Sequence, residues 1–386
     1  MVAMMSMPEA QHRGRILDSP TLSSTASSAW SGRWPRFSLD IFTLFIRFLS
    51  SGAHQQHLML LTTAAATACN GSEDSLPVFC LVSIPSLPES LFPQPPSFFL
   101  IYLLILVGNA LILVVVMAEP SLHKPVYFFL INLSALDILS TTVTVPKMLP
   151  LFLLGDSFLS FPACFLQMYL FHRFSCSEAF ILVVMAYDRY VAICRPLHYP
   201  VLMTLQTNPV LATSAWLTAL LLPIPAVVQT SQMAFDSIAH IYHCFCDHLA
   251  VVQASCSDTN PQTLMGFCIA MVVSFLPLLL VLLSYAHILT LVFRINSQEG
   301  RSKAFSTCSS HLLVVGTYYS SIAIAYVAYR ADLPLDFHVM GNVVLAILTP
   351  VLHSVICMLR NRDVKAAITK IILSKEFCLR LVLLHC

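Results

Sequence analysis

The sequence carries charged side chains inside, or at the ends of, long apolar stretches, where a charge is energetically costly. An Asp188-Arg189 pair ends an apolar run that is about as long as a membrane is thick. A carboxylate beside a guanidinium at the rim of a bilayer can be held as a neutral pair in one conformation and separated in another. These two residues therefore have the chemistry of a conformational switch.

Two further carboxylates lie deeper in apolar runs. Glu178 precedes Arg189 by 11 residues, which at the rise of an α-helix is about 16 Å and close to the bilayer midplane. Asp137 follows Val126, the inner end of its own run, by 11 residues and reaches about the same depth. Bare charge at this depth costs several kcal/mol, so the two groups must be protonated, share a cation or be hydrated. We expect them to face one another across a polar cavity.

The elements that must position these groups are seven apolar runs of membrane-spanning length. They cover residues 98–117, 126–152, 164–193, 209–228, 263–293, 303–329 and 335–358. Each has the roughly 20 residues that a helix needs to cross the hydrocarbon, and several have more, so tilt or protrusion is expected. Pro223, Pro225 and Pro277 should kink their helices. The sequence therefore predicts an all-α membrane protein with a seven-helix transmembrane bundle.

Composition supports the membrane assignment and weakens other classes. Hydrophobic residues make up 57% of the chain, charged residues 10%, and the mean hydropathy is +0.79, which leaves too little polar surface for a soluble globule of this length. A net charge of +1 argues against nucleic acid as a partner. The chain has no phosphate-binding loop, dinucleotide-binding glycine motif or Cys-x-x-Cys zinc spacing. We predict neither an enzyme nor a cofactor.

The orientation follows from the basic residues of the short loops. With the amino terminus outside, the cytosolic side receives nine of them: Lys124, Arg189, Arg195, Arg294, Arg301, Lys303, Arg360, Arg362 and Lys365. Because positively charged loops stay in the cytosol, we expect an outer amino terminus and a cytosolic carboxyl terminus.

Several blocks carry a resemblance to a known family. The segment from Met185 to Cys194, Met-Ala-Tyr-Asp-Arg-Tyr-Val-Ala-Ile-Cys, resembles the third-helix signature of olfactory receptors, which are rhodopsin-like G-protein-coupled receptors. Related blocks lie in order around it at 122–130, 196–199, 284–285 and 303–312. The resemblance covers about Cys69 to Ile371. It implies a multi-pass plasma-membrane receptor, surrounded by membrane lipid, that binds small volatile odorants and couples to a heterotrimeric G protein of the stimulatory, olfactory type.

The resemblance also implies roles for the charged residues. In such receptors the Asp that matches Asp137 lines a polar, often sodium-occupied cavity that collapses on activation. A neutral pair satisfied by Asn109, Ser134 and backbone groups is an equal alternative to such a cavity. In either case Asp137 and Glu178 would belong to the switch and not to the ligand site. By the same resemblance the switch and coupling set also includes Asp188, Arg189, Tyr190, Tyr285 and His311.

The odorant pocket, by resemblance, should lie in the outer half of the bundle. On the third helix Met168, His172, Ser175 and Cys176 recur at spacings of one inward face, and on the sixth so do Tyr319, Ala323 and Tyr326. Small volatile ligands call for a mostly apolar pocket with one or two polar partners. For each residue, ordinary helix packing is the competing explanation. Arg173 either extends along its helix, pairs with a loop acid or lines the pocket.

The outer cysteines imply a disulfide framework. Cys164 and Cys246 match the family pair that pins the long second outer loop, on the oxidising side of the membrane. Many relatives have a further cysteine at the position of Asp236, so Cys244 could replace it as the partner of Cys256, or both could stay free. The same loop is rich in histidines, but its disulfide consumes a thiol, and we predict no metal there.

The ends of the chain follow a different pattern. Residues 1–58 are rich in Ser, Pro and Arg, and we interpret them as a disordered extension or a wrongly chosen start. Residues 59–97 form an outer segment with a glycosylation site at Asn70, 98–358 the receptor domain, and 359–386 a cytosolic tail with a short amphipathic helix beginning near Arg362.

Two alternatives to a working odorant receptor remain. A transporter or channel would show inverted repeats or repeated polar pore residues, and neither is visible. A receptor relic that has lost signalling is the more serious rival, because the family's Asn-Pro-x-x-Tyr pattern falls on 353–357, where His353, Ser354 and Cys357 replace all three defining residues. The prolines at 93–96 also invade the expected outer turn of the first helix and should shorten it.

Overall fold

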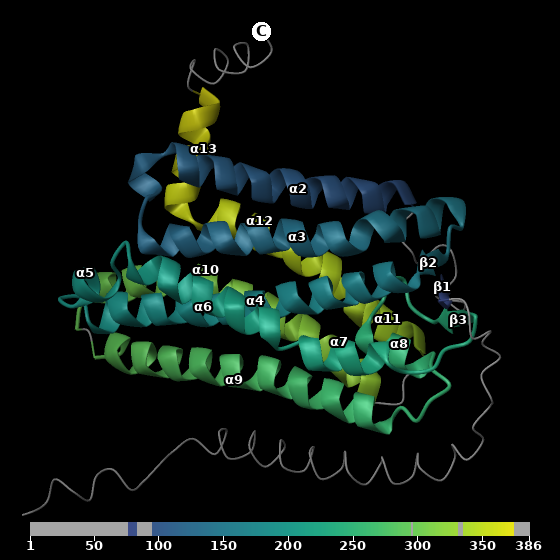
Figure 1. Cartoon of the computed structure of the whole chain (residues 1–386). Helices are drawn as coiled ribbons and strands as arrows, with labels where there is room; N and C mark the ends of the chain where they lie inside the picture. The colour runs from purple at the N-terminus through teal and green to yellow at the C-terminus, as the bar shows by residue number, and fades with distance from the viewer. Residues whose placement is uncertain (1–75, 83–94, 295, 331–334, 374–386) are drawn as a thin grey trace, which may run out of the picture. The chain divides into compact units, whose positions relative to one another are not determined.

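The computed structural model describes residues 76–82, 95–294, 296–330 and 335–373. The predictions made for residues 1–58 and for Asn70 lie outside these residues. All of the described residues belong to one compact unit, 67–386, and its long helices run side by side (Figure 1).

The long helices follow the order that the apolar runs predict. They are α2 (Pro95–Ala118), α3 (Pro125–Leu154), α4 (Phe161–Cys194), α6 (Thr207–Leu221) with α7 (Ile224–Ser231), α9 (Asn260–Val292), α10 (Gln298–Arg330) and α11 (Leu335–Val343) with α12 (Thr349–Arg360). Five of the described helical stretches are apolar and long enough to cross a membrane: Ser97–Ala118, Pro125–Leu154, Thr207–Ser231, Asn260–Val292 and Val339–Arg360. The fold is thus the predicted seven-helix bundle.

The two remaining long helices, α4 and α10, are equally long but more polar. With 34 and 33 residues they match the others in reach. For α4, the polar side chains are explained by its position as the central helix of the bundle. It contacts α3, α6, α7, α9 and α10, so much of its surface faces protein rather than lipid, and there polar groups find partners.

Prolines divide one spanning helix and leave others continuous. The fourth spanning helix breaks between α6 and α7 at Pro223, whereas α9 runs without interruption through Pro277. The first spanning helix, α2, begins at Pro95, and its expected shortening by the prolines at 93–96 stays a prediction. Its prolines Pro95 and Pro96 occupy the first turn, where backbone N–H groups have no helical partner in any case.

The seventh spanning helix is irregular just before the substituted family motif. A π-helical segment, Val344–Leu348 (η2), joins α11 to α12. Pro350 follows in the first turn of α12 and has no backbone N–H to donate to the preceding turn. This irregular stretch ends at Leu348, between one and two helical turns before His353.

The outer end of the bundle holds a small sheet that the sequence did not predict. Strand β1 (Val78–Leu81) lies in the middle, antiparallel to β2 (Phe158–Ser160) and parallel to β3 (Ile238–Ile241). In Figure 1 the strands lie at one end of the bundle, with the short inner-loop helix α5 (Tyr199–Leu202) and α13 (Arg362–Leu373) at the other. Phe79 on β1 is fully buried and packs against Phe161, Phe165 and Phe235. The sheet therefore ties the segment before α2 to the first and second outer loops.

The inner end is closed by short elements and side-chain bonds. A 3-10 turn, η1 (Pro120–Leu122), links α2 to α3, and α13 packs on α2 and α12. The hydroxyl of Tyr127 on α3 donates to Asp363 on α13 at 2.8 Å, and Lys370 pairs with Glu119 at 2.8 Å. The helix α13 begins at Arg362, where the sequence predicted the start of an amphipathic helix.

Candidate functional site

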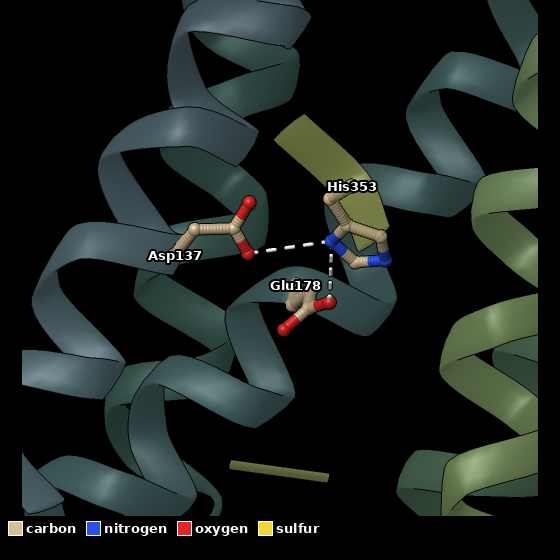
Figure 2. Close-up of side chains that lie close together, drawn as sticks. All are labelled: Asp137, Glu178 and His353. Carbon is tan, nitrogen blue, oxygen red and sulfur yellow. Dashed lines mark hydrogen bonds and ion pairs between the residues drawn. The ribbon is translucent and has the colours of Figure 1, made fainter. Parts of the chain in front are cut away.

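Three ionisable side chains from three helices meet in the middle of the bundle (Figure 2). Asp137 comes from α3, Glu178 from α4 and His353 from α12. The Nδ1 atom of His353 lies 3.3 Å from Oδ1 of Asp137 and 3.4 Å from Oε1 of Glu178. The three side chains are 1%, 8% and 1% exposed. The structure thus brings the two midplane carboxylates together, with an imidazole between them.

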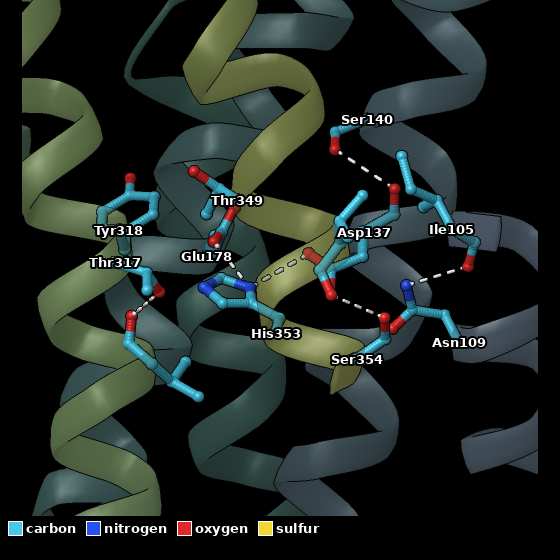
Figure 3. A network of polar contacts seen from close by, with 12 residues as sticks. Ile105, Asn109, Asp137, Ser140, Glu178, Thr317, Tyr318, Thr349, His353 and Ser354 are labelled. Atoms are coloured by element: carbon cyan, nitrogen blue, oxygen red, sulfur yellow. Dashed lines mark hydrogen bonds and ion pairs between the residues drawn. The ribbon is translucent and has the colours of Figure 1, made fainter. Parts of the chain in front are cut away.

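Hydroxyl groups surround this cluster, which Figure 3 shows from close by. The hydroxyls of Ser140 and Thr141 donate to the backbone carbonyl of Asp137, at 3.4 and 2.6 Å. Asn109 donates to the carbonyl of Ile105 on its own helix, at 3.1 Å, and not to a carboxylate. The alternative in which Asn109 satisfies the acids therefore finds no support, because His353 occupies the place next to them.

The Asp188-Arg189 pair lies at the inner end of α4. The guanidinium of Arg189 donates to Oδ2 of Asp188, with its Nε at 2.8 Å. Tyr199, on α5 of the second inner loop, donates its hydroxyl to the other oxygen, Oδ1, at 2.9 Å. The carboxylate of Asp188 is fully buried and the arginine side chain is 13% exposed. A buried pair of this kind is stable only while both members stay in place.

The other predicted switch residues lie on neighbouring helices. Tyr285 of α9 and His311 of α10 share a hydrogen bond at 2.7 Å between the phenol oxygen and Nδ1, and their rings stack at 5.7 Å. Tyr190 packs edge-on against His287 of α9. Cys357 is a buried free thiol on α12. Among the described residues, the Tyr285 phenol therefore hydrogen-bonds to the sixth spanning helix, not the seventh.

The predicted ligand residues of α4 have mixed surroundings. Met168 is fully buried in the apolar cluster under the outer loop. His172 is 32% exposed and its Nε2 lies 3.8 Å from Asp247. The carbonyl of Ser175 accepts a hydrogen bond from Tyr318 at 2.8 Å, and Cys176 is a buried free thiol. Their part in odorant binding stays a prediction.

On α10, Tyr318 is more buried than Tyr319, the adjacent tyrosine that the sequence predicted to face the ligand. Tyr318 is 1% exposed and lies edge-on against Tyr319, which is half-buried. Ala323 is exposed, and the side chain of Tyr326 lies outside the described residues. Of the two adjacent tyrosines, Tyr318 is therefore the one that joins α10 to α4.

The predicted disulfide between Cys164 and Cys246 is present. The two Cα atoms are 5.5 Å apart, and the bond ties the start of α4 to the long second outer loop. Gln167, one turn further on, supports the same contact. Its side-chain oxygen accepts from the backbone N–H of Cys246 at 2.9 Å, and its amide donates to Val143 of α3 at 2.9 Å.

The pairing suggested between Cys244 and Cys256 is wrong. Cys244 is a free thiol that is fully buried in apolar surroundings, and this burial raises its pKa to about 12. Cys256 is disulfide-bonded, but not to Cys244. Cys244 does not pair with Cys256, because its thiol lies in the core beneath the loop. The alternative in which both cysteines stay free is also wrong, because Cys256 is disulfide-bonded.

Of the three places considered for Arg173, the structure excludes a pairing with a loop acid among the described residues. Its guanidinium lies over the rings of Phe174 and Trp216, at 5.5 and 5.8 Å from their centroids. No carboxylate pairs with it among the described residues. An aromatic face stabilises a cation where water is scarce, so this arginine serves the contact between α4 and α6.

His248 begins α8 (His248–Gln253) in the second outer loop and is 5% exposed. Burial and the nearby His172 lower its pKa to about 4, against a weaker opposite effect of Asp247. Its Nε2 lies 3.2 Å from the hydroxyl of Thr230. The ring is therefore neutral at physiological pH.

Acidification should destabilise the folded receptor through His248. Between pH 6.5 and about 4 the unfolded chain binds a proton at this ring and the folded chain does not. Stability is thus full above 6.5 and falls as the pH drops towards 4, by about 3 kcal/mol in total. Thermal unfolding in detergent across this range should show the loss, and His248→Gln should flatten it. An equally steep profile in that variant would contradict the assignment.

Gly266 of α9 is the helical position against which this ring packs. A Cβ atom at residue 266 would lie 2.5 Å from Cε1 of His248. Gly266→Ala should therefore displace the ring and cost about 1–3 kcal/mol of unfolding free energy. The matched control is Gly316→Ala, where no atom lies within 4 Å of the new Cβ. Equal thermal midpoints for both variants would refute the predicted clash.

Sequence reasoning missed several residues that the structure makes central: His353, Tyr318, Gln167 and Tyr199. His353 was interpreted only as the loss of the family's asparagine. A depth count on the seventh helix, like the one that placed Asp137 and Glu178, was the signal that could have located it. Gln167 lies three residues after Cys164, on the same helix face, which is a usable signal as well.

Comparisons with known proteins agree on one family. Residues 98–375 match the family model described as olfactory receptor. The chain is 80% identical over 314 residues to olfactory receptor 2AT4 of Homo sapiens, covering 81% of this chain and 98% of that receptor. It is 42% identical over 287 residues to olfactory receptor 10A2 of Homo sapiens, covering 74% and 93%. Squid rhodopsin shares the fold, with a TM-score of 0.59 at 17% identity over 75% of this chain and 89% of that one.

Proposed function

Because the chain belongs to the olfactory receptor family, whose members are multi-pass plasma-membrane receptors and not enzymes, we propose that it detects small volatile odorants. We further propose that it couples to a heterotrimeric G protein of the stimulatory, olfactory type. The ligand enters the outer half of the bundle, between α4 and α10. The signal leaves at the inner end.

The observation that carries this proposal is the arrangement at the inner end of α4. Arg189 is held by Asp188, and Asp188 is held in turn by Tyr199 of the second inner loop. A rotation that separates this pair frees the guanidinium and moves the loop at the same time. Because α4 also contacts α3, α6, α9 and α10, a ligand bound against its outer half can bias that rotation.

Odorant binding is supported by the chemistry around α4. His172 and Cys176 lie half-buried or buried on a largely apolar stretch, and the Tyr319 hydroxyl has no hydrogen-bonding partner among the described residues. A small ligand with one polar group needs such a donor or acceptor in an apolar setting.

The test is odorant-evoked cAMP in cells that express the full chain at the surface. An odorant panel should give a response that Arg189→Ala abolishes at equal surface expression, because the coupling cation is then lost. A matched control is Arg195→Ala, which removes an exposed cation just beyond the end of α4. A chain that reaches the surface and responds to no odorant, even with the family motif restored at 353–357, would contradict the proposal.

A further inference from the structure

We propose that Asp137, Glu178 and His353 form a binding site for a divalent transition-metal ion, with Zn²⁺ as the ion that fits the site. One ligand atom from each residue lies within 4.8 Å of the other two, inside the bundle (Figure 2). This proposal is independent of odorant binding and of signalling. It concerns a group of side chains that relatives with an asparagine at the position of His353 would lack.

The distances within the cluster suit a zinc ion. Nδ1 of His353 lies 3.3 Å from the Asp137 oxygen and 3.4 Å from the Glu178 oxygen. Ligand atoms about 2.0–2.1 Å from a tetrahedral zinc are separated from one another by about 3.3 Å. The two nitrogen–oxygen separations therefore already match those between the ligands of a tetrahedral zinc ion. Only the two carboxylate oxygens must come closer to each other.

Each of the three side chains has one buried polar atom without a hydrogen-bond partner among the described residues. Oδ2 of Asp137, Oε1 of Glu178 and Nε2 of His353 have no hydrogen bond among the described residues, although all three side chains are more than nine-tenths buried. With both carboxylates ionised and the imidazole neutral, the cluster would carry a charge of −2 near the membrane midplane, which is costly without a counter-ion. A divalent cation cancels that charge and gives the facing atoms a common partner.

The identity of the donors decides the class of ion. Related receptors often hold sodium in the cavity that Asp137 lines, and hard cations of that kind take oxygen ligands. Here a ring nitrogen, with a lone pair on Nδ1 when that atom is unprotonated, stands between the carboxylates. Imidazole is a ligand for zinc and its neighbours in the periodic table, whereas carboxylate and water suit the harder ions. The three residues present therefore do not fit sodium, and they do fit zinc.

The consequence of such a site is mechanical. Its ligands come from α3, α4 and α12, so one ion would join three spanning helices, with a fourth position left for water. Bound zinc should hold these helices in the arrangement seen here and raise resistance to unfolding.

The first experiment measures zinc on the purified full chain in detergent, after treatment with EDTA. Wild type should bind one zinc ion through this site, and its thermal midpoint should rise by about 2–4 °C with ZnCl₂. His353→Asn and Asp137→Asn should bind zinc at least about tenfold more weakly. The matched control is His287→Asn, whose exposed ring on α9 hydrogen-bonds to its own helix and packs against Tyr190, away from the three proposed ligands. That variant should behave like wild type.

A second arm separates this site from the histidines of the outer loop. The double variant His172→Asn/His248→Asn removes those rings and should keep the midplane zinc. If it loses the zinc response while His353→Asn retains it, the proposal is overturned. It is equally overturned if wild type and His353→Asn bind zinc alike, or if NaCl in place of choline chloride stabilises wild type as much as zinc does.

A measurement on wild type alone covers the case in which a variant fails to fold. Zinc X-ray absorption should show one nitrogen and carboxylate oxygens at about 2.0–2.2 Å, with no sulfur at about 2.3 Å. Sulfur in the coordination shell would place the ion at a cysteine and reject the midplane site. Absence of bound zinc would mean that the three side chains share protons instead, which also rejects it.

Discussion

Replacing Cys164 and Cys246 together by serine is expected to lower the free energy of unfolding by about 2–5 kcal/mol. The disulfide spans a sequence separation of 82 residues, and a loop of that size gives the unfolded chain much entropy when the bond is removed. The native state also loses the anchor of the second outer loop on α4. The double variant avoids leaving a reactive thiol in the core.

The loss of stability should come from the missing disulfide and not from the removal of a cysteine as such. Cys268→Ser changes an exposed free thiol on α9 and should leave the thermal midpoint unchanged. Gln167→Ala, which keeps the disulfide but removes the side chain that holds Cys246 and Val143, should give an intermediate loss. If the double serine variant unfolds at the same temperature as Cys268→Ser, the disulfide does not stabilise the bundle.

Restoring the family motif in the seventh helix should raise odorant-evoked cAMP by roughly 5- to 150-fold at equal surface expression. In the resembled family the tyrosine of this motif moves inward on activation and meets, through water, the tyrosine that matches Tyr285. Here Cys357 has no hydroxyl or ring for that contact, and Tyr285 bonds to His311 instead. The triple substitution is His353→Asn, Ser354→Pro and Cys357→Tyr.

The physical reason is a difference between two states and not a loss of packing. A contact made only in the active state shifts the balance by its own free energy, about 1–3 kcal/mol, and leaves the inactive fold intact. The backbone N–H that Ser354 restores also stiffens a helix that a proline would let bend.

Single variants separate the contributions. Cys357→Tyr alone supplies the phenol, whereas His353→Asn alone removes the imidazole between Asp137 and Glu178. A wild-type chain that already signals as strongly as the triple variant would show that the motif is dispensable here. A gain from His353→Asn alone would assign the weakness to the midplane cluster rather than to the missing tyrosine.

The spanning helices could be predicted from the sequence because their signal is local and large. Apolar runs of this length have few alternatives to a membrane helix, and the depth of Asp137 and Glu178 follows from the fixed rise of such a helix. Each predicted run lies on one described helix or on two successive ones, with ends that differ by a few residues. Only the exact ends depend on neighbours, as with Pro95 in the first turn of α2.

The rest depended on contacts between distant parts of the chain. Strand β1 has four residues and no pattern of its own, and its partner β3 lies on the far side of four spanning segments. The direction of Cys244 is fixed by the core under the loop, not by its neighbours in sequence. Arg173 meets Trp216 of α6, a contact that no local pattern encodes. His353 departs from the family motif, yet its imidazole lies between Asp137 and Glu178 and can bind a proton or a metal ion there.

The central place of β1 in the sheet sets an order of events during biosynthesis. Val78 pairs with Ile238, about 160 residues later, and at typical synthesis rates of about 5–20 residues per second that partner emerges roughly 8–30 s afterwards. Until then the edge of β1 that pairs with β3 stays open in the secretory lumen, a state that favours association with other chains. Only when α7 has been inserted and β3 follows it can the strand be covered on that edge. Closure of this sheet is therefore a late maturation step that reports correct insertion of the first four spanning segments.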